Sequence, residues 1–368
     1  MPLLRYPVQA QRRSLQAAPL EAAIPGRYNI LVVAPSWVGD AVMAQPLFRR
    51  LHRRHPGLAL DVLAPPWTAP VFRHMPEVRE VLDSPFRHGE LNLPARYRLG
   101  RRLRPRGYHQ AIILPNSLKS ALMPFFAGIP LRTGFVGELR RGLINDARPL
   151  DRAALPLMVE RFAQLAEPPS TPLHRPLPRA ALRVGEDEQR ALLDRLGLRP
   201  RGPVAAFCVG AEYGPAKRWP PEYFAQLARM LAERGYAVWL VGSPKDREIG
   251  AEVARQSGGA ALNLCGKTDL SEAIALLAGT ALVVSNDSGL MHVAAALERP
   301  LLALYGSSSP GFTPPLSDLA QVVSLNLPCS PCFKRECPLG HFRCMRELTP
   351  ERVREELGHL EGQPQRNA

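Results

Sequence analysis

Apolar runs and helix-like patterns alternate along the first part of the chain. The pattern predicts strands at residues 30–33, 59–63, 80–82 and 110–114, and helices at residues 41–52, 68–75 and 117–126. Continuous apolar runs ended by Pro or Gly are typical of buried parallel strands, and apolar residues recurring with a helical period indicate helices. The alternation therefore predicts an α/β domain with a parallel sheet.

The same alternation restarts after a proline-rich segment. It predicts strands at residues 204–208, 237–241, 281–285 and 301–305, and helices at residues 221–234, 245–257, 270–278, 289–297 and 349–360. We expect two doubly wound domains with ligands beyond the carboxyl ends of their strands. The predicted divisions are a disordered extension over 1–27, an N-terminal domain over 28–166, a linker over 167–180, a C-terminal domain over 181–348 and a helix with a tail over 349–368.

Composition and charge narrow the class of protein. The chain has 368 residues, 46% of them hydrophobic, which is enough for two domains with separate cores. It has no apolar run of the roughly 20 residues that span a bilayer, and no signal-peptide pattern at its N-terminus, so we expect a soluble cytoplasmic protein.

The net charge of +14 favours an anionic partner. Nucleic acid, an anionic membrane surface and a phosphorylated substrate all fit this charge, and a solvated basic face explains much of it equally well. The sequence lacks zinc-finger, zipper and aromatic single-strand-binding patterns, which argues against nucleic acid.

A short motif, Ser-Trp-Val-Gly-Asp, follows the first predicted strand at residues 36–40. Asp40 falls where a helix begins at the edge of the expected crevice. An Asp at such a junction commonly caps the helix, which is worth about 1 kcal/mol. A functional carboxylate at the crevice is the other interpretation.

A glycine-containing loop, residues 209–220, connects a strand to a helix in the second domain. Its glycines allow close approach of the backbone, and Lys217 and Arg218 bring positive charge to a helix N-terminus, where phosphate binds favourably. The loop matches neither the P-loop nor the dinucleotide-binding pattern. It predicts a diphosphate site or, equally, an ordinary loop with solvated cations.

A second strand-to-helix loop lies at residues 283–296. Ser288 and Gly289 can direct hydroxyl and N–H groups at phosphate oxygens, and Asp287 can accept hydrogen bonds from sugar hydroxyls. His292 lies one turn into the helix on the same side as Gly289. The combination indicates a ligand site.

Four of the six cysteines crowd into one segment, residues 329–344, which also holds His341. In a cytoplasmic chain this density favours metal binding by thiolates over disulfides, and a structural zinc is the specific hypothesis. The spacing departs from standard zinc patterns, so free thiols or redox-linked pairs are alternatives. The zinc ligands would be Cys329, Cys332, Cys337 and Cys344.

Four segments together resemble glycosyltransferase family 9. They are residues 36–40, 114–121, 210–220 and 286–296, and the resemblance runs in order from about residue 28 to about residue 320. It implies a GT-B architecture, with two Rossmann-like domains facing across a cleft. It also implies inverting transfer of L-glycero-D-manno-heptose from ADP-heptose to the first heptose of the lipopolysaccharide inner core.

The resemblance also implies roles for individual residues. Asp40 would be the general base, with Gly39 allowing a tight turn before it, and Lys217 would offset charge on the departing diphosphate. The donor-binding residues would be Gly39, Gly210, Lys217, Gly242, Asp246, Thr268, Asp287, Ser288, Gly289 and His292. Acceptor recognition would fall to four cations that a solvated surface explains equally well: Lys119, Arg132, Arg140 and Arg141.

Partners and alternatives follow from the same resemblance. We expect ADP-heptose as co-substrate, no obligatory cofactor, a lipopolysaccharide acceptor and no nucleic acid. The basic charge fits transient docking on the anionic inner face of the cytoplasmic membrane. The alternatives are a family 9 enzyme that adds the first or third heptose, and a noncatalytic protein that binds a sugar nucleotide.

Overall fold

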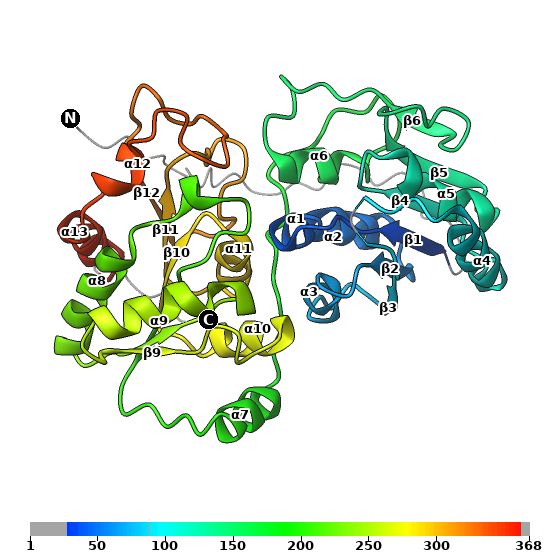
Figure 1. Ribbon diagram of the computed structural model, residues 1–368. Coiled ribbons are helices and arrows are strands. Elements are labelled where there is room, and N and C mark those ends of the chain that lie inside the picture. The colour runs from blue at the N-terminus through cyan, green and yellow to red at the C-terminus, as the bar shows by residue number, and fades with distance from the viewer. Residues whose placement is uncertain (1–27, 88, 362–368) are drawn as a thin grey trace. The chain divides into compact units, whose positions relative to one another are not determined.

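The computed structural model describes residues 28–87 and 89–361 (Figure 1). The chain divides into two compact units between Ala180 and Ala181. The predicted extension over 1–27 and the last residues of the tail lie outside the described residues. Within them, no helix has the length and apolar character needed to cross a membrane.

The N-terminal unit contains a six-stranded sheet in which all neighbouring strands are parallel. Its strands, in spatial order, are β3 (Glu80–Asp83), β2 (Ala59–Ala64), β1 (Asn29–Val33), β4 (Gln110–Ile113), β5 (Leu131–Phe135) and β6 (Asp146–Arg148). The order reverses beside β1, which pairs with β2 on one side and with β4 on the other. This is the strand order of a Rossmann domain.

Helices cover this sheet. They are α1 (Val38–Met43), α2 (Gln45–Arg54), α3 (Ala69–Arg73), α4 (Leu93–Leu103), η1 (Arg104–Arg106), α5 (Leu118–Phe126) and α6 (Met158–Gln164). Helices α4 and α5 pack against each other, while α1 contacts α3 and α6. The helix predicted over 41–52 is two helices that meet at Ala44, where Pro46 at the start of α2 lacks the N–H that would continue α1.

The C-terminal unit repeats this topology with a second six-stranded parallel sheet. Its strands, in spatial order, are β12 (Ala320–Ser324), β11 (Leu301–Tyr305), β10 (Leu282–Asn286), β7 (Val204–Cys208), β8 (Ala237–Leu240) and β9 (Ala261–Asn263). Here the order reverses between β7 and β10. The two units therefore share one topology.

The helical segments of the second unit include the five helices that the sequence predicted and others that it missed, among them a ten-residue helix over residues 186–195. They are α7 (Glu186–Arg195), η2 (Pro215–Lys217), α8 (Pro221–Glu233), η3 (Pro244–Asp246), α9 (Arg247–Gln256), α10 (Leu270–Ala278), α11 (Gly289–Ala296), α12 (Arg343–Arg346) and α13 (Pro350–Glu361). The last helix, α13, contacts α8, β11 and β12. It therefore belongs to the core of this unit.

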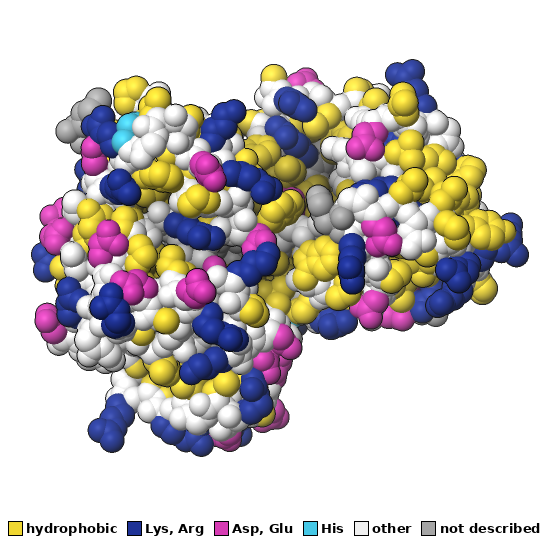
Figure 2. Space-filling view, in the orientation of Figure 1, with side chains coloured by type: hydrophobic (Ala, Val, Ile, Leu, Met, Phe, Trp, Pro, Cys, Tyr) yellow, Lys and Arg dark blue, Asp and Glu magenta, His cyan; other side chains and the backbone are white. Residues whose placement is uncertain are grey.

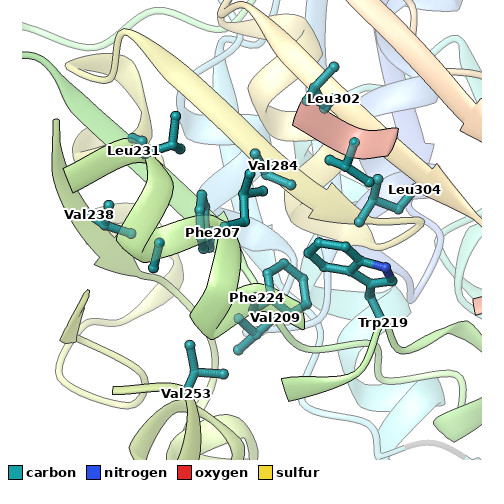
Figure 3. Packing of buried hydrophobic residues seen from close by; sticks show 14 of the residues in the cluster. Phe207, Val209, Trp219, Phe224, Leu231, Val238, Val253, Val284, Leu302 and Leu304 are labelled. Carbon is teal, nitrogen blue, oxygen red and sulfur yellow. The ribbon is translucent and has the colours of Figure 1, made fainter. Parts of the chain in front are cut away.

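The core of the C-terminal unit places an aromatic cluster beside the loop that follows β7 (Figure 3). Trp219 is fully buried, its ring meets Phe224 edge-on with centroids 4.8 Å apart, and its indole N–H donates to the carbonyl of Leu348 at 2.7 Å. Burial of a side chain of this size typically contributes about 2–3 kcal/mol. Trp219 therefore fixes the end of the loop at residues 209–218.

Candidate active site

The four motifs that carry the resemblance lie where each sheet reverses its strand order. In the N-terminal unit the loops after β1 and β4 carry two of the motifs, and in the C-terminal unit the loops after β7 and β10 carry the other two. Ligands of doubly wound sheets bind at this position, beyond the carboxyl ends of the strands. Each unit therefore carries its own group of candidate residues, which we call its half-site.

Asn286, the last residue of β10, holds the loop after β7 in place. Its side-chain oxygen accepts the backbone N–H of Trp219 at 3.0 Å, and its amide nitrogen donates to the carbonyl of Val209 at 2.8 Å. One fully buried amide thus ties together both ends of the loop. Asn286 was not predicted to have a role, although it begins the segment 286–296 that carries part of the resemblance.

Lys217 and Asp287 form an ion pair within this half-site. The ammonium Nζ of Lys217 lies 2.5 Å from Oδ2 of Asp287, and the side chains are 17% and 5% exposed. A charged pair with so little access to water has lost much of its hydration, which only a close partner offsets. The pair brings a cation for phosphate and a carboxylate for hydroxyl groups to one place.

Tyr213 and the cysteine-rich segment form a wall behind Lys217. The ring of Tyr213 lies 5.2 Å from Nζ of Lys217 and 5.3 Å from the guanidinium of Arg335, which are cation–π distances. Its hydroxyl donates to the carbonyl of Phe333 at 2.8 Å, and the backbone N–H of Ala216 donates to the carbonyl of Arg335 at 3.0 Å. These contacts fix the position from which the Lys217 side chain extends.

Helix α11 begins directly after Asp287. Ser288 is the residue before its first turn and Gly289 is its first residue, and both are partly exposed. The first N–H groups of a helix have no partner within the helix, and the helix dipole favours an anion there. The structure thus brings Lys217 next to Asp287, which is followed directly by Ser288 and Gly289.

His292 lies one turn inside α11 and is buried. Burial lowers its pKa to about 4, with Asp287 opposing this shift and Lys217 reinforcing it. The imidazole is therefore neutral at physiological pH. Its Nδ1 atom is buried and has no hydrogen-bond partner among the residues that the structure describes. His292 thus belongs to this half-site as a neutral group.

Four of the predicted donor-binding residues lie in three loops: Gly210 after β7, Gly242 and Asp246 after β8, and Thr268 after β9. Asp246 accepts hydrogen bonds from the backbone N–H and hydroxyl of Ser243, at 2.9 and 2.7 Å, so its Oδ2 atom already caps a short helix. Gly210 and Gly242 lie against this carboxylate, and a Cβ atom on Gly210 would lie 2.4 Å from it. Thr268 has a buried hydroxyl with no partner among the described residues.

In the N-terminal unit, a pocket of about 720 Å³ opens at the ends of β1, β2 and β4. Asp40 lines it from the third position of α1, whose preceding residue is Trp37. Asp40 therefore does not occupy the N-cap position. Gly39 also lies inside α1, so the expectation that it forms a tight turn is wrong. Trp37 and Trp67 are both half exposed at this pocket.

Several cations line the same pocket. Lys119 at the start of α5 is one of them, as predicted, and Arg87, Arg152 and Arg161 are others that the sequence did not indicate. Burial, and then the neighbouring charge of Arg152, lowers the pKa of Arg161. Cations placed close together in one pocket favour an anionic ligand.

The other three predicted acceptor residues do not line this pocket. Arg140 is only 2% exposed, and its guanidinium donates to the carbonyls of Pro115, at 2.6 Å, and of Phe135. Burial lowers its pKa to about 10. The expectation that Arg140 is a surface cation is therefore wrong, because it supports the loop after β4 from behind. Arg132 donates to the carbonyl of Leu143 at 2.6 Å, and Arg141 is exposed elsewhere.

Comparison with known proteins places this arrangement in a family. A profile of glycosyltransferase family 9 (heptosyltransferase) matches residues 96–343. The chain is 47% identical over 341 residues to lipopolysaccharide heptosyltransferase 2 of Escherichia coli (strain K12), covering 90% of this chain and 98% of that relative. The chain belongs to glycosyltransferase family 9.

Two further relatives refine this assignment. A solved structure titled E. coli ADP-heptose LPS heptosyltransferase II matches with a TM-score of 0.81 at 46% identity, over 90% of this chain and 98% of that one. Lipopolysaccharide heptosyltransferase 1 of Pseudomonas aeruginosa is 30% identical over 356 residues, 89% of this chain and 97% of that relative. The predicted α/β fold class is confirmed, since both units are Rossmann-like. The predicted glycosyltransferase activity is confirmed by the match to family 9 and by the heptosyltransferase relatives.

The cysteine-rich segment of this family 9 enzyme does not support the zinc hypothesis. No group of three or more His, Cys, Asp or Glu side chains in residues 28–87 and 89–361 is arranged to hold a metal ion. Cys329 is exposed, and Cys337 accepts the backbone N–H of Phe342 at an S···N distance of 3.4 Å. The segment instead contacts the Lys217 loop through Phe333 and Arg335.

Proposed function

We propose that this family 9 enzyme is heptosyltransferase II, which transfers L-glycero-D-manno-heptose from ADP-heptose to the first heptose of the lipopolysaccharide inner core. The observation that carries the proposal is the ion pair of Lys217 and Asp287 at the start of α11. It offers a cation to a diphosphate and a carboxylate to sugar hydroxyls. The relative from E. coli, at 47% identity, bears the name of this activity.

The donor would bind in the C-terminal unit. Lys217 and the N-terminus of α11 are positive where charge develops on the departing ADP, and such preorganised groups lower the barrier to transfer. Asp287 would accept hydrogen bonds from heptose hydroxyls. The neutral His292 can donate or accept one hydrogen bond with the donor without adding charge. Gly210, Gly242, Asp246 and Thr268 would lie toward the adenosine.

The acceptor would bind in the N-terminal pocket, where Asp40 is the proposed general base. Asp40 takes the proton of the acceptor hydroxyl as its oxygen attacks the anomeric carbon. The bond from that carbon to the diphosphate oxygen breaks, and ADP leaves with the electron pair. Direct displacement of this kind inverts the anomeric configuration. Asp40 lies in the first turn of α1.

The cations of the pocket suit the chemistry of this acceptor. Kdo carboxylates and core phosphates are anionic, and the guanidinium groups of Arg152 and Arg161 can bind them bidentately. Lys119 adds a third positive charge from the first turn of α5. Because the acceptor is carried on lipid A, the enzyme would act in the cytoplasm at the inner face of the cytoplasmic membrane.

The test is ADP release with defined acceptors. Heptose-Kdo₂-lipid A should support turnover and Kdo₂-lipid A should not, while the reverse result would identify an enzyme that adds the first heptose. Asp40→Asn should lower kcat by a factor of about 10²–10⁴, the usual contribution of a general base, and leave the affinity for ADP unchanged. Asp187→Asn, at an exposed position of α7, is the matched control. Near-normal turnover by Asp40→Asn would remove Asp40 from the chemistry.

A further inference from the structure

Large apolar side chains are exposed on one region of the N-terminal unit that the proposed reaction does not use. Tyr97 on α4 is 50% exposed, Phe125 on α5 is 43% exposed, and Leu131 at the start of β5 is 37% exposed. Phe126 joins them, since its ring meets the rings of Tyr97 and Phe125 edge-on at 5.3 and 5.8 Å. We call this set, with Leu93, the α4–α5 surface. None of its members lines the pocket that holds Asp40.

The sequence of α4 divides its circumference into a buried and an exposed face. Leu93, Tyr97 and Arg101 recur every four residues, so they share one exposed face, while Arg96, Gly100 and Leu103 are buried. Gly100 brings α4 close to α5, because a Cβ atom there would lie 2.6 Å from Cβ of Phe126. The exposed face of α4 therefore continues into the aromatic residues of α5.

Cations border this apolar area. Four exposed arginines do so: Arg98, Arg101, Arg102 and Arg104. None of them forms an ion pair with a carboxylate in the described part of the chain. Arg104 also lies over the end of α5, with its Nε 3.6 Å from the position of a Cβ atom on Gly128. Figure 2 shows hydrophobic side chains gathered over α5 and dark-blue cations beside them over α4.

We propose that the α4–α5 surface docks this enzyme on an anionic phospholipid bilayer. Aromatic and aliphatic side chains that stand in water gain free energy when they enter the interface between headgroups and acyl chains. Unpaired arginines beside them are attracted to anionic headgroups, and each contributes about a fivefold increase in partitioning. A neutral surface of a second protein would offer no counter-charge to these arginines, whereas anionic headgroups do. Charge complementarity therefore favours the bilayer as the partner of this surface.

The test is co-sedimentation of the full chain with vesicles that contain no acceptor or donor, so its result is independent of the proposed reaction. Vesicles of phosphatidylethanolamine with one quarter phosphatidylglycerol should bind the protein, and pure phosphatidylcholine should bind it at least tenfold more weakly. Raising the salt concentration from 0.1 to 1 M should weaken binding, because it screens the arginine charges.

Two sets of variants locate the binding surface. Replacing Arg98, Arg101, Arg102 and Arg104 with Gln should reduce partitioning at least tenfold. A control with the same change in net charge, Arg201, Arg229, Lys334 and Arg354 to Gln in the C-terminal unit, should reduce it less than threefold. Tyr97→Ser with Phe125→Ser should abolish the binding that persists in 1 M salt, and circular dichroism should show unchanged secondary structure.

The proposal has two ways to fail. Equal losses in the two charge variants would show that only the overall charge of the chain matters, and the α4–α5 surface would then have no special role. Sedimentation of the free protein as a dimer, reversed by the Tyr97→Ser and Phe125→Ser changes, would show that a second copy of the chain covers the surface.

Discussion

Replacing Lys217 with Met tests the donor half-site most directly. The substitution keeps the length and most of the apolar stem of the side chain but removes its charge. Asp287, only 5% exposed, would then be left without the ammonium that lies 2.5 Å from it. We expect two separate effects, on the stability of the C-terminal unit and on the rate of transfer.

The expected loss of stability follows from the burial of the pair. Breaking a buried ion pair at one partner typically destabilises a protein by 3–5 kcal/mol, and because Lys217 retains some access to water we expect about 3 kcal/mol. A matched control exists, since Lys245 and Glu212 form a pair at the same 2.5 Å distance with side chains 73% and 56% exposed. Lys245→Met should therefore change stability by less than about 1 kcal/mol.

Hydrogen exchange of peptides from β7 and β10 measures the unfolding free energy of this unit. Steady-state ADP release measures the rate, and Lys217→Met should lower kcat by a factor of about 10²–10³ because charge on the leaving group loses its counter-charge. The double variant Lys217→Met with Asp287→Asn should recover most of the stability but none of the activity. That separation distinguishes charge burial from catalysis.

Two results would refute this reasoning. Single variants whose losses of stability add within about 0.5 kcal/mol in the double variant would show that the two groups do not interact in solution. A kcat for Lys217→Met within fivefold of the wild type would show that the cation does not act on the departing diphosphate. Either result would remove the observation on which the proposed function rests.

Three further predictions concern neighbouring residues. His292 has a folded-state pKa of about 4, below its ordinary value near 6.5, so as the pH falls the unfolded chain takes up a proton at a higher pH than the folded chain. The free energy of unfolding should therefore fall between pH 6.5 and pH 4, by at most about 1.4 kcal/mol per pH unit. In His292→Gln, the free energy of unfolding measured by hydrogen exchange should depend less on pH. Tyr213→Phe should retain kcat within about threefold, whereas Tyr213→Leu, which removes the ring between Lys217 and Arg335, should raise the KM for ADP-heptose about tenfold, corresponding to roughly 1.4 kcal/mol. Gly210→Ala should displace the carboxylate of Asp246 and lower the melting temperature, at a free-energy cost of about 1–3 kcal/mol.

Sequence predicted the central strands of both sheets because their burial makes them continuously apolar. The predicted strands at 204–208 and 301–305 coincide with β7 and β11. Two strands at the edges of the sheets, β6 and β9, were missed for the opposite reason. Strand β6 is three residues long and reads Asp-Ala-Arg, and β9 is equally short, so neither carries enough apolar residues to form a pattern. Their place is fixed by pairing with a neighbouring strand.

Helix α4 was missed although it is longer than several predicted helices. Its sequence, Leu-Pro-Ala-Arg-Tyr-Arg-Leu-Gly-Arg-Arg-Leu, buries Arg96 and Gly100 where a helical pattern is expected to show large apolar residues. The guanidinium of Arg96 lies 3.9 Å from the centre of the Phe86 ring and donates to the carbonyl of Lys119 at 3.1 Å. A buried cation satisfied by backbone carbonyls cannot be read from hydrophobic periodicity.

The need for tertiary contacts also explains why sequence could predict the surroundings of some candidate residues and not of others. Asp287, Ser288 and Gly289 are adjacent in sequence, so the end of one strand is enough to predict that they lie together beyond the sheet. Lys119 follows β4 and Arg140 follows β5, so in sequence both look like cations just beyond a strand, but Lys119 lines the pocket and Arg140 is buried beneath the loop. The difference arises because the guanidinium of Arg140 donates to the carbonyls of Pro115 and Phe135, which only the folded chain brings close to it. Local sequence therefore identifies strand-end motifs, whereas the role of an isolated arginine requires the three-dimensional structure.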